Sequence, residues 1–152
     1  LLPSILVFPV YWLVMIFLGG GQEEIGWRGY IMPFLESKYG LWAGNTILGI
    51  VWALWHAPLW FIPDSFQTFM PFPAFLIGCI GQSFFLSWVV KASGNKPMSA
   101  LVAHGASNAF IPLFPSLILA TSIFQVHFWI LEFLYLFIGI AALFSLKKTN
   151  TS

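Results

Sequence analysis

Long and almost uncharged apolar segments restrict what this chain can fold into more than any other feature. A helix that crosses a bilayer needs about 20 mostly apolar residues, and the sequence has five such segments: 3–20, 42–62, 72–90, 98–119 and 124–146. Only 7% of the residues are charged, whereas soluble domains carry roughly 25%. We therefore predict an all-α integral membrane protein with about five transmembrane helices. A soluble enzyme is excluded.

The segment between the first two spans, residues 21–40, combines apolar side chains with charged ones. We predict that it forms an interfacial helix carrying two adjacent glutamates, with breaks at Gly19-Gly20-Gly21 and at Pro33. The 152 residues contain no repeat or soluble linker, so 1–152 is expected to be a single transmembrane domain. Because the chain begins Leu-Leu-Pro without Met, we expect some N-terminal sequence of the full-length protein to be missing.

The distribution of lysine predicts how the chain is oriented. Five alternating spans would place residues 21–41, residues 91–97 and the C-terminus on one side of the membrane. Five lysines fall on that side: Lys38, Lys91, Lys96, Lys147 and Lys148. Because Lys and Arg favour the cytoplasmic side, we predict that this side is cytoplasmic. The net charge of +1 and the lack of a basic block exclude nucleic acid as a partner, and leave membrane lipid as the expected one.

Ionisable residues within a membrane protein's apolar segments suggest a functional site, because they are costly there. Glu24 and Arg28 are four residues apart, so on a helix they share a face and can form a bidentate ion pair. Glu23 points about 100° away, shares its face with Trp27, and is left without a partner at this spacing. Glu23 is therefore a candidate acid or base. The alternative is an interfacial helix with a structural ion pair.

Two further helices each carry a histidine. His56 precedes Pro58, which removes a backbone hydrogen bond and can open room beside the imidazole. His104 and Asn108 are four residues apart beside the small residue Gly105, and such a pair can bind a metal or donate hydrogen bonds to an oxyanion. The alternative for both helices is hydrogen bonding that only holds helices together.

Other polar residues of the spans are expected to pack. His127 and Glu132 are five residues apart in the last span and do not share a face well, so we expect Glu132 to be a hydrogen-bonded packing group. Cys79 lies in an apolar run and is also expected to pack. The predicted depths of the two histidines in the membrane conflict with a site that both would share. His56 lies roughly 22 Å of helix beyond the predicted start of its span, and His104 only roughly 9 Å beyond the start of its own.

Taken in order, these motifs resemble those of the CPBP family of intramembrane proteases, also called the Abi or CAAX protease family. The first family motif matches Glu23, Glu24, Arg28 and Gly29, and the third matches His104 and Asn108. The second matches His56, with Trp52 at a position where the family usually has Phe. The resemblance covers residues 22–110, and the ordered set is more specific than any one motif.

The resemblance implies an intramembrane endopeptidase in a prokaryotic cell membrane, with a site reached from the cytoplasmic side. Its substrates would be membrane-associated or prenylated (CAAX-type) proteins or peptides. In family terms Glu23 and His56 activate the attacking water. His104 and Asn108 stabilise the oxyanion, while Glu24 and Arg28 brace the site.

A metal cofactor is left open. Family members are commonly named metalloproteases, and Glu23, His56 and His104 are a plausible zinc ligand set with one position for water. Glu23 and His56 could instead hold the same water as a general base without a metal. We slightly favour the metal-free mechanism, because Asn108 suits an oxyanion donor better than a zinc ligand. Two other functions stay open: a non-catalytic bacteriocin-immunity or interaction protein on the same scaffold, and a transporter or proton relay.

Overall fold

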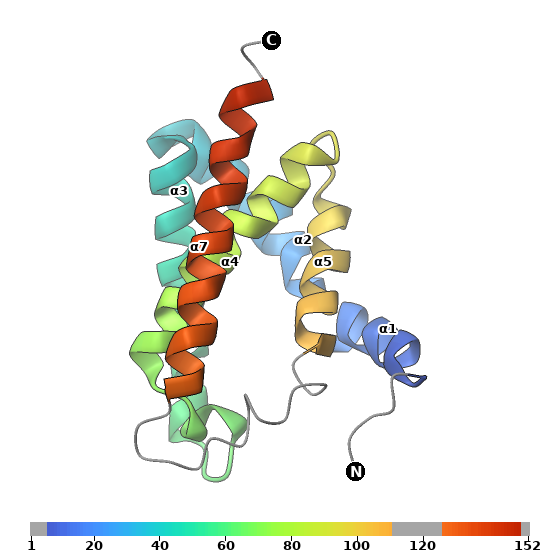
Figure 1. The fold of residues 1–152 in the computed structure, drawn as a ribbon, viewed down its shortest axis with the longest axis vertical. Helices are drawn as coiled ribbons and strands as arrows, with labels where there is room; N and C mark the ends of the chain where they lie inside the picture. Colours follow the sequence, from blue (N-terminus) through green and yellow to red (C-terminus); the bar gives the residue numbers. More distant parts are fainter. Residues whose placement is uncertain (1–5, 111–125, 150–152) are drawn as a thin grey trace.

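The computed structural model describes residues 6–110 and 126–149 of the chain, and every regular element in these residues is helical (Figure 1). The elements are α1 (Phe8–Leu18), η1 (Gly21–Glu23), α2 (Glu24–Gly26), the π-helical η2 (Trp27–Ile31), α3 (Met32–His56), η3 (Ala57–Phe61), η4 (Phe66–Phe69), α4 (Phe72–Ala92), α5 (Pro97–Phe110) and α7 (Val126–Thr149). The prediction of an all-α protein is confirmed for this part of the chain.

Two of the helices, α4 and α7, are long and apolar enough to cross a membrane. They coincide with the predicted spans 72–90 and 124–146. The other three predicted spans correspond to α1, to the second part of α3 with η3, and to α5. Residues 1–5 and 111–125 lie outside the described residues, so the prediction of five spans stays a prediction.

The two long helices differ in how much of their surface other helices cover. In the most apolar stretch of α4, 44% of the residues are buried, whereas in that of α7 only 11% are. The central helix α4 packs against α3, α5 and α7, whereas α7 leaves large apolar side chains exposed, among them Phe133, Phe137 and Phe144. Exposed apolar surface of this extent would be unfavourable in water and suits contact with lipid.

The chain turns sharply at glycine before and after the segment that carries the two glutamates. After α1 ends, Gly20 adopts a φ of +113°, which confirms the predicted break at the glycine run. The predicted break at Pro33 is wrong, because Pro33 lies in the first turn of α3, where a missing N–H is tolerated. The second break is at Gly40, whose φ of +79° and ψ of 169° kink α3.

The start of α3, the connection between α4 and α5, and the C-terminal end of α7 all lie at one end of the molecule, the top of Figure 1. An ion pair between Lys91 and Glu36, with Nζ and Oε1 2.7 Å apart, links the first two of these elements. The fold therefore gathers the three segments that were predicted to share a membrane side. Which side is cytoplasmic stays a prediction.

A buried polar cluster fixes α3 against α4. Asn45 is fully buried and its Oδ1 accepts hydrogen bonds from Ser83 at 3.1 Å and from Ser87 at 2.6 Å, while its Nδ2 donates to the Leu41 carbonyl. Each hydrogen-bonding group of the Asn45 amide therefore has a partner, as a buried amide requires. This cluster holds the helix that carries Trp52 and His56 in register with the central helix.

Candidate active site

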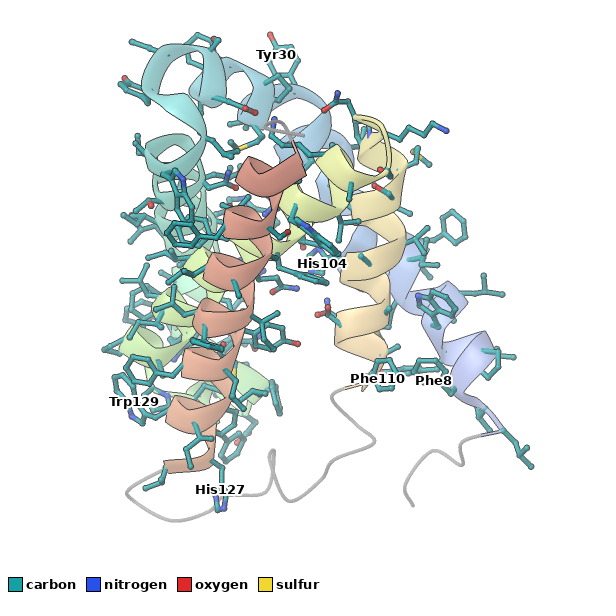
Figure 2. All side chains as sticks on the ribbon, turned by 45° about the horizontal axis from the view of Figure 1, so that its top comes forward. Phe8, Tyr30, His104, Phe110, His127 and Trp129 are labelled. Carbon is teal, nitrogen blue, oxygen red and sulfur yellow. The ribbon has the colours of Figure 1, made fainter. Side chains whose placement is uncertain are left out.

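Three short helical segments, η1, α2 and η2, present the glutamate motif to the centre of the molecule. Within them Glu23 and Trp27 are four residues apart, and so are Glu24 and Arg28, so each pair shares a face. Figure 2 shows Tyr30 of η2 and His127 of α7 at opposite ends of the molecule, with His104 between them. The site built around His104 therefore lies in the interior, away from both ends.

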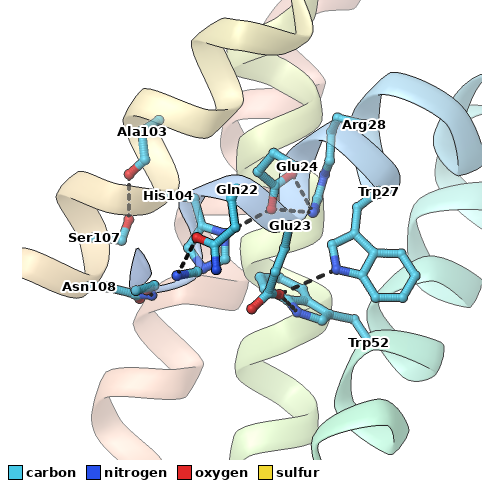
Figure 3. Close-up of polar contacts among 12 residues, drawn as sticks. Gln22, Glu23, Glu24, Trp27, Arg28, Trp52, Ala103, His104, Ser107 and Asn108 are labelled. Atoms are coloured by element: carbon cyan, nitrogen blue, oxygen red, sulfur yellow. Dashed lines mark hydrogen bonds and ion pairs between the residues drawn. The ribbon is translucent and has the colours of Figure 1, made fainter. Parts of the chain in front are cut away.

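Glu24, Arg28 and His104 form a buried cluster, in which an ion pair joins Glu24 to Arg28 and a hydrogen bond joins Glu24 to His104 (Figure 3). Glu24 is 0% exposed and Arg28 is 2% exposed. Nη1 of Arg28 lies 2.8 Å from Oε2 of Glu24 and donates a hydrogen bond of 3.0 Å to Oε1. The predicted pair is therefore present, but one nitrogen contacts both oxygens, so the bidentate geometry that we predicted is wrong. The guanidinium also lies 5.1 Å from the centre of the Trp52 ring, in a cation–π contact.

His104 is oriented by the same carboxylate. Its Nδ1 lies 2.8 Å from Oε1 of Glu24, and because a carboxylate only accepts hydrogen bonds, we assign the ring proton to Nδ1. In the neutral ring, Nε2 then carries a lone pair. Nε2 faces the backbone of Gly20, where an added Cβ would be only 3.0 Å away.

Glu23 has neutral donors as partners instead of a charge. Its Oε2 accepts hydrogen bonds from the indole N–H of Trp52 at 2.8 Å and of Trp27 at 3.3 Å. Trp52 is 3% exposed, so its indole is held in place by the surrounding core. The prediction that Glu23 is left without a partner at helical spacing is wrong, because Trp27, four residues further on, donates to its Oε2. Two indoles fix the position of the carboxylate, and only the contact with Trp27 follows from helical spacing.

His56 lies at the C-terminal end of α3, where the chain continues into η3. Its Nδ1 is 2.9 Å from the Trp52 carbonyl oxygen. Because a carbonyl only accepts, Nδ1 carries the proton here too, and Nε2 of the neutral ring is free to accept one. His56 also contacts Trp55 and Phe75 edge to face, with ring centroids 4.9 and 5.5 Å apart. The imidazole is therefore held by aromatic rings as well as by its hydrogen bond.

Asn108 lies one turn beyond His104 on α5, as predicted from the spacing. Its Nδ2 donates a 2.6 Å hydrogen bond to the Gly19 carbonyl. An added Cβ on Gly20 would lie 2.6 Å from this Nδ2. Gly20 therefore fills two requirements: it provides a left-handed φ that most residues avoid, and it lets the backbone approach both His104 and Asn108.

These side chains surround one cavity of about 520 Å³. Glu23, His56, His104 and Asn108, the four predicted catalytic residues, all line it. Glu24 and Arg28 lie behind the wall formed by Trp52 and His104, where they can only act through those residues. The fold thus brings these four residues together from three separate elements, η1, α3 and α5, and the conflict over the depth of His56 and His104 disappears. Figure 1 shows the reason, since α3 starts above the start of α5.

The cavity was also tested as a metal site. Within residues 6–110 and 126–149, no three His, Cys, Asp or Glu side chains lie close enough together to hold a metal ion. The proposed zinc ligands Glu23, His56 and His104 share the cavity, but they do not converge on one point. We therefore derive no chemical step through a metal.

Sequence reasoning missed two features of the cavity. Trp52 was noted only as a departure from the usual Phe, yet it donates the shortest hydrogen bond to Glu23. Glu132 was expected to be a hydrogen-bonded packing group, but its side chain lines the cavity and has no hydrogen-bond partner among the described residues. The signal for Glu132 was present, because an ionisable residue in the middle of an apolar span suggests function by default.

Comparison with known proteins identifies the class of protein that these features define. The profile of the Rce1-like family, type II CAAX prenyl endopeptidases, matches residues 5–110. This chain belongs to that family, which is membrane-embedded. The resemblance that the three motifs suggested is therefore confirmed.

One relative shows how much of a whole protein this chain represents. CAAX prenyl protease 2 of Methanococcus maripaludis is 44% identical over 98 residues, which are 60% of this chain and 36% of the relative. The chain thus aligns with about a third of the relative's length. No solved structure matches it.

Proposed function

We propose that this chain forms the catalytic region of an intramembrane endopeptidase that hydrolyses peptide bonds in prenylated or other membrane-associated proteins. The observation that carries the proposal is the single cavity that Glu23, His56, His104 and Asn108 line together. The family supports it as well, since its name states a CAAX prenyl endopeptidase activity.

In the proposed mechanism, Glu23 and His56 bind and activate the attacking water. The free Nε2 of His56 accepts a hydrogen bond from the water, and the Glu23 carboxylate takes its proton as the hydroxide attacks the scissile carbonyl. The indole N–H groups of Trp27 and Trp52 keep the carboxylate directed at the water. When the tetrahedral intermediate collapses, the same proton passes to the leaving amine, so that an acid and an amine are released.

The oxyanion of the intermediate would be stabilised from α5. Asn108 Nδ2 has a second N–H besides the one directed at Gly19, and this N–H can donate to the oxyanion. His104 can donate from Nε2 only when both ring nitrogens carry protons. Glu24, 2.8 Å from its Nδ1, would stabilise that imidazolium. In this proposal the Glu24–Arg28 pair positions His104 and does not touch the substrate.

The first test is the Glu23→Gln variant of the full-length protein, reconstituted in liposomes and assayed with a farnesylated CAAX peptide. Glutamine keeps the size of the side chain but cannot take a proton from water, so cleavage should fall by ~10²–10⁴-fold. Glu36→Gln is the matched control, because Glu36 pairs with Lys91 away from the cavity. Cleavage by Glu23→Gln at the wild-type rate would refute the mechanism.

A second experiment asks about substrates in cells. New protein N-termini are compared by mass spectrometry between hosts that express the wild type and hosts that express Glu23→Gln at matched levels. Termini that depend on Glu23 would name the substrates. Identical profiles, together with unchanged protection of the cells against a bacteriocin, would support the non-catalytic alternative instead.

A further inference from the structure

A carboxyl group from the last helix reaches the same cavity. Glu132 of α7 lines it, together with Gly78 of α4. The Glu132 carboxyl rests directly on Gly78, so closely that a Cβ at Gly78 would overlap it. Glycine at this position of α4 is what allows the carboxyl to turn toward the cavity. Glu132 lies beyond residues 5–110, which the family profile matches, so the family motifs do not include it.

Nothing in the described part of the chain pairs with this carboxyl. No hydrogen bond or ion pair joins Glu132 to another described residue. A carboxyl group within an apolar helix is unfavourable unless it has a partner. Glu24 shows how the same fold satisfies a buried carboxylate, with Arg28 and His104 as partners. A group of the substrate that enters the cavity can supply the partner that the described residues do not.

The charges around the cavity limit what that partner can be. Neither Lys nor Arg is among the described residues that line it, and the guanidinium of Arg28 is buried behind the wall against Glu24 and Trp52. Among the residues that the structure describes, Glu23 and Glu132 supply the two carboxyl groups of its lining. A carboxylate of the substrate placed there would meet two carboxyl groups and no cation among the described lining residues, whereas an ammonium, guanidinium or N–H group would meet acceptors.

We propose that Glu132 is a specificity-determining residue that binds the peptide substrate and selects against acidic side chains beside the scissile bond. The favoured side chain at the position facing α7 is basic, a neutral hydrogen-bond donor is second, and an acidic one is disfavoured. This inference rests on the proposed function, because it concerns the substrate of the same cavity.

The test uses the full-length protein in liposomes and farnesylated CAAX peptides in which Lys, Gln or Glu replaces in turn each residue within three positions of the scissile bond, with the farnesylated cysteine left unchanged. Wild-type kcat/KM should follow the order Lys, Gln, Glu at one of these positions, with roughly tenfold or more between Lys and Glu. Glu132→Gln should reduce that ratio to about 1–3 at the same position. Gly78→Ala should reduce it too, since a Cβ displaces the carboxyl.

Controls separate this inference from the proposed function. Glu36→Gln should keep the wild-type ratio, because its carboxylate is outside the cavity. Binding of the same peptides, labelled with a fluorophore, is measured by anisotropy with Glu23→Gln and with Glu23→Gln/Glu132→Gln. A Lys-to-Glu preference that disappears with Glu132 supports the inference even if no peptide is cleaved, in which case only the proposed function fails. An equal ratio with and without Glu132, in both cleavage and binding, overturns it.

Discussion

Glu23 and Glu24 are neighbours in the sequence and carry the same functional group, but the fold surrounds them differently. Glu24 is fully buried and contacts Arg28 and His104, both at 2.8 Å. Glu23 lines the cavity and accepts hydrogen bonds from two indoles, which carry no charge. Because successive residues of a helix are rotated by about 100° about its axis, the side chains at adjacent positions reach different surroundings. One carboxylate can thus maintain the structure while the other stays available for chemistry.

The largest effect on stability is expected when the buried pair is broken. Arg28→Met leaves the Glu24 carboxylate buried next to an apolar chain, and loss of one partner of a buried ion pair costs about 3–5 kcal/mol. Unfolding in detergent micelles, followed by circular dichroism, measures the loss. Glu23→Gln should change the unfolding free energy by less than about 1 kcal/mol, because its indole donors remain paired with the amide oxygen.

Lys91→Met provides the matched control for that comparison. It also removes the cation of an ion pair, but both partners of the Lys91–Glu36 pair are about 30% exposed. Pairs of this kind contribute about 0–1 kcal/mol. If Arg28→Met and Lys91→Met destabilised the protein equally, burial of the Glu24 cluster would not explain its contribution.

A smaller loss of stability is expected from a substitution of Gly20, which adjoins the side of the cavity where the oxyanion would bind. Alanine there has to adopt a left-handed φ, at a cost on the order of 1–3 kcal/mol, and its Cβ would crowd Asn108 Nδ2 and His104 Nε2. We expect Gly20→Ala to lower kcat by ~10-fold or more while the Glu24 cluster stays intact. Gly26→Ala is the control, since an added Cβ there has no neighbour within 4 Å. Equal activity of the two variants would contradict this role for Gly20.

Helical spacing explains which parts of the site were predictable. The pairs Glu24–Arg28 and His104–Asn108 lie on single helices, so their shared faces followed from the sequence. The hydrogen bond from Trp52 to Glu23 joins residues 29 apart, and the approach of Glu132 to the cavity depends on how α7 packs on Gly78. Neither contact leaves a periodic pattern. The position of the break in α3 was not predictable from the sequence either, because Pro33 and Gly40 are both helix-breaking residues. Pro33 does not break the helix because it lies in the first turn of α3.

The two indoles provide the sharpest comparison, since both donate to the same oxygen of Glu23. Trp52→Phe keeps an aromatic ring and removes the 2.8 Å hydrogen bond, whereas Trp27→Phe removes the longer one of 3.3 Å. A hydrogen bond to a charged group contributes about 1.5–3 kcal/mol, so Trp52→Phe should lower kcat by ~10–100-fold with little change in KM. Trp27→Phe should lower kcat less, because the hydrogen bond that it removes is longer and therefore weaker.

Trp88→Phe is the control for both variants, because the Trp88 indole donates to Ser145 and does not line the cavity. If both active-site variants kept wild-type kcat, Glu23 would not need its indole donors, and the carboxylate would be positioned by something other than these two hydrogen bonds.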